Sequence, residues 1–287
     1  MAKMTIPDAL KKDVPQTKWG RILTATPIIM TVIATALAGL ASSEMTRAQY
    51  SRSLAAQEQS KAGDQWGFFQ AKRLRGALQR STLDILQGTT DVHPFTASDL
   101  DAQTLAALTK SELPKFPDGA AMNAELKAAL DLVQEEGANA PVRLTDKELE
   151  EGIRAAKERA KAFDDATNPI NKAIDQLDRT LAGGDKSLHR DFAAARLRYT
   201  AARYDAEARL NQAIANLYEL QVRKGNLDAE RHHKRSQQFF YGMLGAQAAV
   251  IISTFSLAAQ KRSLLWSLAA AAGAAAVSFA VYVYLFV

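Results

Sequence analysis

The sequence predicts an all-α membrane protein with three transmembrane helices, one near the N-terminus and two that form a C-terminal hairpin. Residues 22–41, 239–259 and 264–287 carry no charge, and each stretch is long enough as a helix to cross a hydrocarbon layer of roughly 30 Å. Residues 42–238 are rich in Ala, Leu, Glu, Lys, Gln and Arg and lack period-two alternation, which predicts helices instead of strands. Because the chain has no cysteine, disulfides, thiolate metal sites and cysteine nucleophiles are excluded.

The first span, residues 22–41, follows a basic tail, residues 1–21, that carries five Lys or Arg and two Asp. A secretory signal with a small-residue cleavage site at residues 36–38 is the alternative interpretation. The apolar run is longer than the usual apolar core of such a signal, so an uncleaved anchor is favoured. Pro27 removes one backbone hydrogen bond and predicts a mild kink.

The second and third spans are separated only by residues 260–263, so they are expected to form a membrane hairpin. Small residues recur at every fourth position in the spans, as at Gly245, Ala249 and Ser253, and such rows let helices approach closely. Gln247 is the one strongly polar side chain within the three spans. The spans are therefore expected to pack against each other or against further copies.

Charge suggests on which face of the bilayer residues 42–238 lie. This region is net neutral, with 29 residues of each sign, whereas the tail and the hairpin connection are both net positive. The positive-inside rule then places the tail and the connection in the cytoplasm and residues 42–238 outside, in the periplasm. Lys and Arg close to the spans are equally numerous on the two faces, so they do not decide the orientation. The predicted orientation relies on the rule that long loops cross the membrane largely regardless of charge, whereas short tails and hairpins follow their charge.

Five helical stretches, separated by Gly and Pro, are expected in the middle region. They run from the membrane to about residue 88, over 98–113, over 120–136, from Thr145 to about residue 183, and from Lys186 into the second span. Thr145 and Glu148 have the spacing of a capping box, and Pro169 predicts an interruption.

The first and last of these stretches are expected to pair as a long antiparallel stalk, with the three shorter helices at its tip or along it. Residues three or four positions apart would form the seam: Phe192, Ala195, Tyr199, Ala202, Ala206, Leu210, Ala213, Leu217 and Leu220 against Phe68, Ala71, Leu74, Leu78 and Ile85. The seam is rich in Ala and is interrupted by Arg203 and Arg209, so an isolated pair would bury little apolar surface. Homo-oligomerisation is therefore predicted.

The most distinctive segment of the middle region is the run from Asp64 to Arg73. It is interpreted as an interaction surface made by Asp64, Gln65, Trp66, Phe69, Gln70 and Lys72. The alternative, which the helical spacing of the aromatic residues favours, is aromatic packing within the stalk.

The same segment resembles the Asp-Gln-Trp, aromatic, Gln-Ala-Lys signature of an uncharacterised bacterial membrane-protein family, a domain-of-unknown-function family with one N-terminal and two C-terminal spans. The matching residues are Asp64, Gln65, Trp66, Phe69, Gln70, Ala71 and Lys72. The resemblance covers the two ends of the chain well, whereas residues 90–185 align only as helix. It implies a multi-pass protein of the bacterial inner membrane and brings no assigned activity or catalytic residue.

Basic residues beside the spans are predicted to lie at the membrane interface and contact lipid headgroups: His232, His233, Lys234, Arg235, Lys261 and Arg262. Asp228 and His232 are one helical turn apart, but a structural metal site needs about four ligands and the sequence offers no others nearby. Neither a metal nor a cofactor is predicted, and no catalytic motif occurs. The neutral middle region argues against nucleic-acid binding.

These observations favour a membrane-anchored, self-associating scaffold over an enzyme. Its expected partners are membrane lipids, further copies of the chain and another membrane or envelope protein. The alternative is an oligomeric channel or transport accessory subunit, whose weakly polar pore would be lined by Gln247 and threonines.

Overall fold

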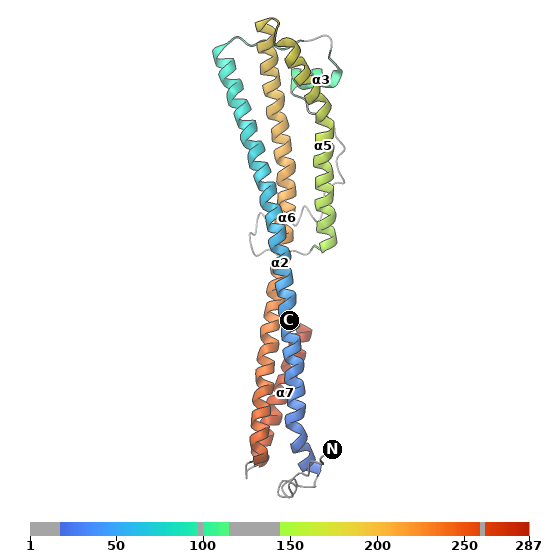
Figure 1. The fold of residues 1–287 in the computed structure, drawn as a ribbon, viewed down its shortest axis with the longest axis vertical. Helices are drawn as coiled ribbons and strands as arrows, with labels where there is room; N and C mark the ends of the chain where they lie inside the picture. Colours follow the sequence, from blue (N-terminus) through green and yellow to red (C-terminus); the bar gives the residue numbers. More distant parts are fainter. Residues whose placement is uncertain (1–17, 97–99, 115–143, 259–261, 287) are drawn as a thin grey trace, which may run out of the picture. The chain divides into compact units, whose positions relative to one another are not determined.

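The computed structural model describes residues 18–96, 100–114, 144–258 and 262–286. The chain is an all-α membrane protein, and the described residues form five helices (Figure 1): α2 (Lys18–Thr89), α3 (Ala102–Lys110), α5 (Asp146–Leu181), α6 (Lys186–Ala258) and α7 (Arg262–Phe286). Three of them, α2, α6 and α7, are long and apolar enough to cross a membrane, which confirms the three predicted spans. The helix expected over 120–136 lies outside the described residues.

The chain divides into two units. The first unit comprises residues 1–53 and 225–287 and contains the three apolar stretches, and the second unit comprises residues 54–224. Both α2 and α6 contribute residues to each unit, whereas α3 and α5 belong to the second unit and α7 to the first.

The predicted antiparallel pairing of α2 with α6 is confirmed in the second unit. The Trp66 indole donates to Glu219 over 2.7 Å, and Lys72, further along α2, pairs with Glu207, which precedes Glu219 on α6. As residue numbers rise along α2, those of their partners therefore fall along α6. In this unit α6 lies between α2 and α5 (Figure 1).

The seam predicted on α2 is wrong. The side chains of Phe68, Leu74, Leu78 and Ile85 are 53, 71, 63 and 65% exposed, so they face away from α6. Small residues spaced by seven make the contact instead: Ala34, Ala41, Ala48, Ala55 and Ala62 on α2 are buried, as are Ala201, Ala208, Ala215, Val222, Ala229 and Ser236 on α6. Small side chains allow two helix backbones to approach closely, and the larger apolar residues of α2 lie on the opposite face of the helix.

The helix α5 begins where the capping box predicts. The Thr145 hydroxyl accepts from the Glu148 backbone N–H, and the Glu148 carboxylate accepts from the Thr145 N–H. The predicted interruption at Pro169 is absent, since α5 continues to Leu181. The proline removes only the bond to the carbonyl of Asp165, an exposed residue whose backbone water can reach.

Two apolar clusters hold the second unit together. Leu149 and Ile153 of α5 pack with Leu217 and Leu220 of α6, and further along the helices Ile170 packs with residues of α3, α6 and the segment before α3. The second cluster contains Phe95, Ala107, Leu108, Ile170, Ile174, Phe192, Ala195 and Tyr199. The short helix α3 is capped by the Asp101 carboxylate, and hydrogen bonds from the side chain and backbone of Thr104 lower the pKa of that group.

The first unit buries mostly small residues and exposes many large apolar ones, as membrane helix bundles do. Its core joins Ala34 and Leu37 of α2, Phe239 and Ala246 of α6, and Ala276 of α7. Its exposed side chains are apolar and suited to lipid, among them Ile28, Val32, Ile251, Phe255, Leu264, Val281 and Leu285. Trp266 closes one end of the bundle by donating to the Thr26 hydroxyl over 3.1 Å.

Candidate functional site

The segment of α2 singled out from the sequence has two faces. Trp66, Phe69 and Lys72 are half-buried and lie toward α6, whereas Asp64 and Gln70 are exposed. Gln65 is half-buried too, and its side-chain oxygen has no hydrogen-bond partner within the described part of the chain. The six residues therefore do not converge on one surface.

Aromatic packing accounts for the inward face of this segment. The rings of Trp66 and Phe69 meet edge to face, with centroids 5.3 Å apart and planes 82° apart. The Trp66 nitrogen is satisfied by Glu219, and the Arg73 guanidinium lies 5.7 Å from the centroid of Phe69. These contacts fix the two aromatic rings against α6.

Lys72 belongs to a buried charge cluster. Its ammonium pairs with the Glu207 carboxylate, which also lies 3.3 Å from Arg203 on α6. Lys72 and Arg203 also lie 5.5 and 4.9 Å from the centroid of the Tyr204 ring. Glu207 is 7% exposed, so these two cations offset the cost of burying its charge.

An open groove of about 400 Å³ runs beside this cluster between α2, α5 and α6. Arg75, Asp164, Asp165, Asn168 and Asn171 line it together with the residues of the cluster. Burial raises the pKa of Asp164, and the negative charge of Glu207 raises it further while Lys72 opposes the change. The groove holds three basic and three acidic side chains, so it favours neither cations nor anions.

A second groove, of about 380 Å³, lies between the same three helices nearer the start of α5. Lys61 of α2 and Lys157 of α5 lie 5.9 and 5.2 Å from the centroid of Tyr218 on α6. Glu58, which is 6% exposed, accepts from Lys61 over 2.9 Å, and this bond raises the pKa of Lys61. Like the first groove, this one is lined by equal numbers of basic and acidic side chains.

The outward face of α2 in the second unit carries an apolar stripe, made by Phe68, Ala71, Leu74, Leu78 and Ile85. At 3.6 residues per turn these positions fall within about one third of the helix circumference. All five residues are exposed. Scattered apolar residues are normal on soluble surfaces, whereas these four large ones are aligned on one face of a helix.

The basic residues predicted at the membrane interface are partly neutralised. His232 Nδ1 lies 2.6 Å from a Glu44 carboxylate oxygen, and Lys234 lies 2.7 Å from Glu230. His233 contacts Gln237 over 3.1 Å. Arg235 is half-buried. Lys261 lies outside the described residues, and Arg262 is the first residue of α7.

Sequence reasoning missed Glu44, which is 8% exposed and lies three residues beyond the first span. It accepts from Arg47 over 3.3 Å in addition to its contact with His232. The neighbouring Ser236 hydroxyl donates to the carbonyl of Ala41 over 2.7 Å. The signal that could have located it is the seven-residue spacing of Ala41 and Ala48, because Glu44 lies between them on the same face of the helix.

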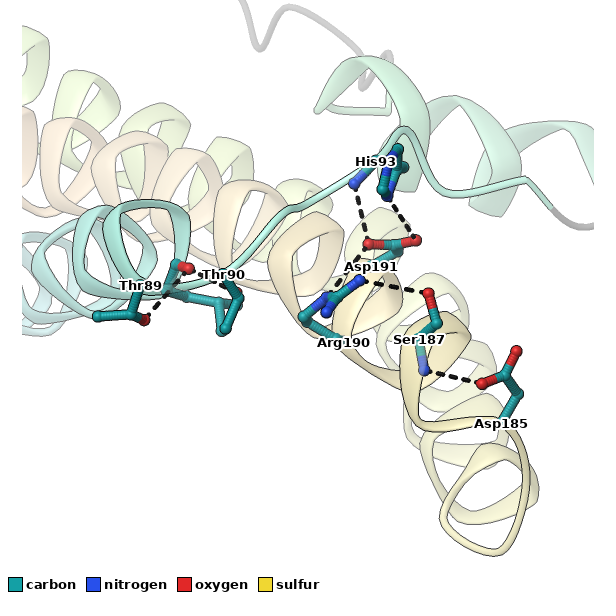
Figure 2. Close-up of polar contacts among 8 residues, drawn as sticks. Thr89, Thr90, His93, Asp185, Ser187, Arg190 and Asp191 are labelled. Atoms are coloured by element: carbon teal, nitrogen blue, oxygen red, sulfur yellow. Dashed lines mark hydrogen bonds and ion pairs between the residues drawn. The ribbon is translucent and has the colours of Figure 1, made fainter.

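Asp191 was also missed. This buried carboxylate on α6 accepts from the backbone N–H of His93 over 2.9 Å, and thereby ties the segment that leaves α2 to the start of α6 (Figure 2). Arg190 lies 3.8 Å away and also donates to Ser187, while the Ser187 N–H donates to the Asp185 carboxylate. No local pattern marks Asp191, because its partner is 98 residues away.

Within residues 18–96, 100–114, 144–258 and 262–286, no three His, Cys, Asp or Glu side chains are grouped so as to hold a metal ion. Asp228 and His232, the pair considered from the sequence, do not act together, since His232 faces Glu44. The described side chains thus form packed helices with an apolar stripe and grooves that include the two charge-balanced ones. Comparison of the chain with protein-family models, curated proteins and solved structures finds no match.

Proposed function

We propose that this protein is a membrane-anchored helical scaffold that associates with further copies of itself through the apolar stripe of α2. The observation that carries the proposal is the exposure of Phe68, Leu74, Leu78 and Ile85 in one row on a helix outside the apolar spans. Burying one such side chain contributes roughly 1.5–3 kcal/mol. Four of them on each copy favour association, in opposition to the entropy lost when two copies pair.

A second copy fits the stripe because α2 is one helix that contains both the first span and the stripe. Copies inserted in the same bilayer point in the same direction, so each presents its stripe at the same place along α2. A parallel, twofold pair then brings each apolar residue next to its own counterpart. Confinement to the bilayer plane raises the local concentration of the copies and favours this encounter.

The resemblance stated above and the charge distribution support a place in the bacterial inner membrane, with residues 42–238 in the periplasm. Lipid headgroups would contact the basic residues beside the spans, and another envelope protein is a further candidate partner. We propose a non-catalytic role, because the charged residues beside the two grooves, Lys72 with Glu207 and Lys61 with Glu58, are already engaged with each other.

The test replaces both Leu74 and Leu78 by Glu in the full-length chain. Two charges in the stripe oppose its burial, so we expect the association constant to fall by more than tenfold. Light scattering of the detergent-solubilised protein and photobleaching of single particles in lipid nanodiscs measure the copy number. A wild-type protein that is monomeric in both preparations contradicts the proposal.

The matched control combines Gln59→Glu with Gln87→Glu, which adds the same two negative charges at exposed polar positions of α2 outside the stripe. We expect it to leave the copy number unchanged. Equal loss of association in this control and in the stripe variant would show that charge on α2, and not the apolar row, sets the assembly.

A second candidate function is an oligomeric channel or transport accessory subunit, favoured by the exposure of Gln247 within a span. In such an assembly the amide lines a weakly polar pore. Solute or ion flux through proteoliposomes, altered by Gln247→Leu, would support this candidate. Flux no higher than that of protein-free liposomes would remove it.

A further inference from the structure

Gln247 lies on the outer face of α6, inside the second span. It is exposed, and its neighbours on that face, Leu244 and Ile251, are 44 and 57% exposed. Within the described residues the amide has no hydrogen-bond partner. A face of this kind meets hydrocarbon in a single copy of the chain.

Hydrocarbon cannot satisfy a primary amide, which carries two donor hydrogens and an acceptor oxygen. The threonine hydroxyls exposed in the spans do not raise this problem, because each bonds to its own helix. Thr254 donates to the carbonyl of Val250 over 2.8 Å, and Thr31 donates to that of Pro27 over the same distance. Among the described residues of the span, Gln247 is the one exposed amide, and it has no such bond to its own helix.

We propose that Gln247 hydrogen-bonds to Gln247 of a second copy within the bilayer. An amide both donates and accepts, so two identical amides satisfy each other across a twofold axis. Copies oriented alike in one membrane hold Gln247 at equal depth, which is the condition for this contact. No other strongly polar side chain exists in the three spans, so Gln247 is the match that a second copy offers.

This inference rests on the proposed self-association but uses a different part of the chain from the α2 stripe. The stripe lies in the second unit, whereas Gln247 lies in the first. The two contacts can therefore be removed by separate substitutions. When one contact is removed, the association through the other can still be measured.

The test exploits the natural absence of cysteine. In the full-length chain in membranes, Ile251→Cys places a thiol one turn from Gln247 on the same face, and oxidation should link two copies. Adding Gln247→Leu should lower the rate of linking roughly three- to thirty-fold, the range expected for one interhelical hydrogen bond in a bilayer. Gln247→Asn retains the amide and should restore most of the linking.

Two matched variants control the result. Thr254→Val removes a polar group from the same face without removing an interhelical bond, so linking through Ile251→Cys should not change. Leu268→Cys sits on α7, at a position that is 53% exposed, so it reports random collision between copies and should link more slowly than Ile251→Cys.

Equal rates of linking with the native Gln247 and with Gln247→Leu would overturn the inference. If light scattering finds copies associated through the stripe while Ile251→Cys links no faster than Leu268→Cys, the inference fails and the proposed function stands. A monomeric protein overturns both. Labelling of Gln247→Cys by a charged, membrane-impermeant thiol reagent would place the residue in water and also overturn the contact.

Discussion

Tyr199 illustrates what one buried side chain does in the second unit. It is 1% exposed within the cluster that joins α3, α5 and α6, and its hydroxyl has no partner among the described residues. Burial raises the pKa of Tyr199 to about 12, an effect that Arg203 opposes and Glu207 supports. The fold therefore keeps the phenol neutral where an unfolded chain would ionise it.

We predict that Tyr199 makes the free energy of unfolding depend on pH in alkaline solution. Its folded pKa lies above the unfolded value of about 10, so its contribution is complete below pH 10 and is lost as pH rises toward 12. The loss should approach about 1.4 kcal/mol per pH unit across this interval. Denaturant titrations of the detergent-solubilised chain at a series of pH values measure it.

Tyr199→Phe is the control for this titration, since the lysines that ionise over the same range are common to both proteins. The variant should lack the extra alkaline loss. At neutral pH it should be as stable as the wild type or more stable by about 1 kcal/mol, because it removes an unpartnered buried hydroxyl. Identical pH profiles for the two proteins would show that Tyr199 does not stay neutral in the fold.

The pairing of α2 with α6 depends on space that only small residues leave. A Cβ at Gly76 would lie 3.2 Å from an Asp205 oxygen, 3.5 Å from Tyr204 Cβ and 3.6 Å from the carbonyl of Ala201. Asp205 is held in place by Arg80. By contrast, a Cβ at Gly63 would meet no atom within 4 Å.

We predict that Gly76→Leu lowers the free energy of unfolding by about 1–3 kcal/mol, because the side chain must be forced between two helices. Gly63→Leu, on the exposed side of the same helix, should raise it by up to about 1 kcal/mol through helix propensity. Thermal or denaturant unfolding followed by circular dichroism compares the two. Gly76→Leu as stable as Gly63→Leu would mean that α2 and α6 do not pack closely at this position.

A local signal located the start of α5 well. The capping box at Thr145 and Glu148 fixes the start of α5, since both partners lie within four residues. The packing face of α2 could not be predicted in the same way. Apolar periodicity selects the largest side chains, whereas this pair is built on alanines and on polar groups whose partners, such as His232 for Glu44, are far away in sequence.

At the scale of the whole chain, three spans impose a topology. With three crossings, Ser263, between the second and third spans, lies on the same face of the bilayer as the N-terminal tail. Residues 42–238 then lie on the other face. The spans themselves could be predicted, because length and lack of charge suffice. The direction of insertion is set by charges that are nearly balanced here, so it stays a prediction.

We predict that Gln59→Cys is labelled by an impermeant maleimide added to intact bacterial spheroplasts, whereas Ser263→Cys is labelled only after permeabilisation. The cysteine-free chain gives each variant a single reactive thiol. The reverse pattern would place residues 42–238 in the cytoplasm. Labelling of both thiols from one side would contradict three crossings.

The small residues, mostly alanines, that recur at every seventh position on α2 and α6 have one more consequence. A displacement of one helix along the other by seven residues, about 10 Å, exchanges one small residue for another at most positions of these rows, with Val222 on α6 as an exception, and so changes the steric fit little there. Alanines alone therefore cannot select a single alignment. The polar pairs Glu44–His232 and Lys72–Glu207 select the alignment, because each pair can form at only one position of α2 along α6. These two pairs therefore determine which of the sterically similar alignments the two helices adopt.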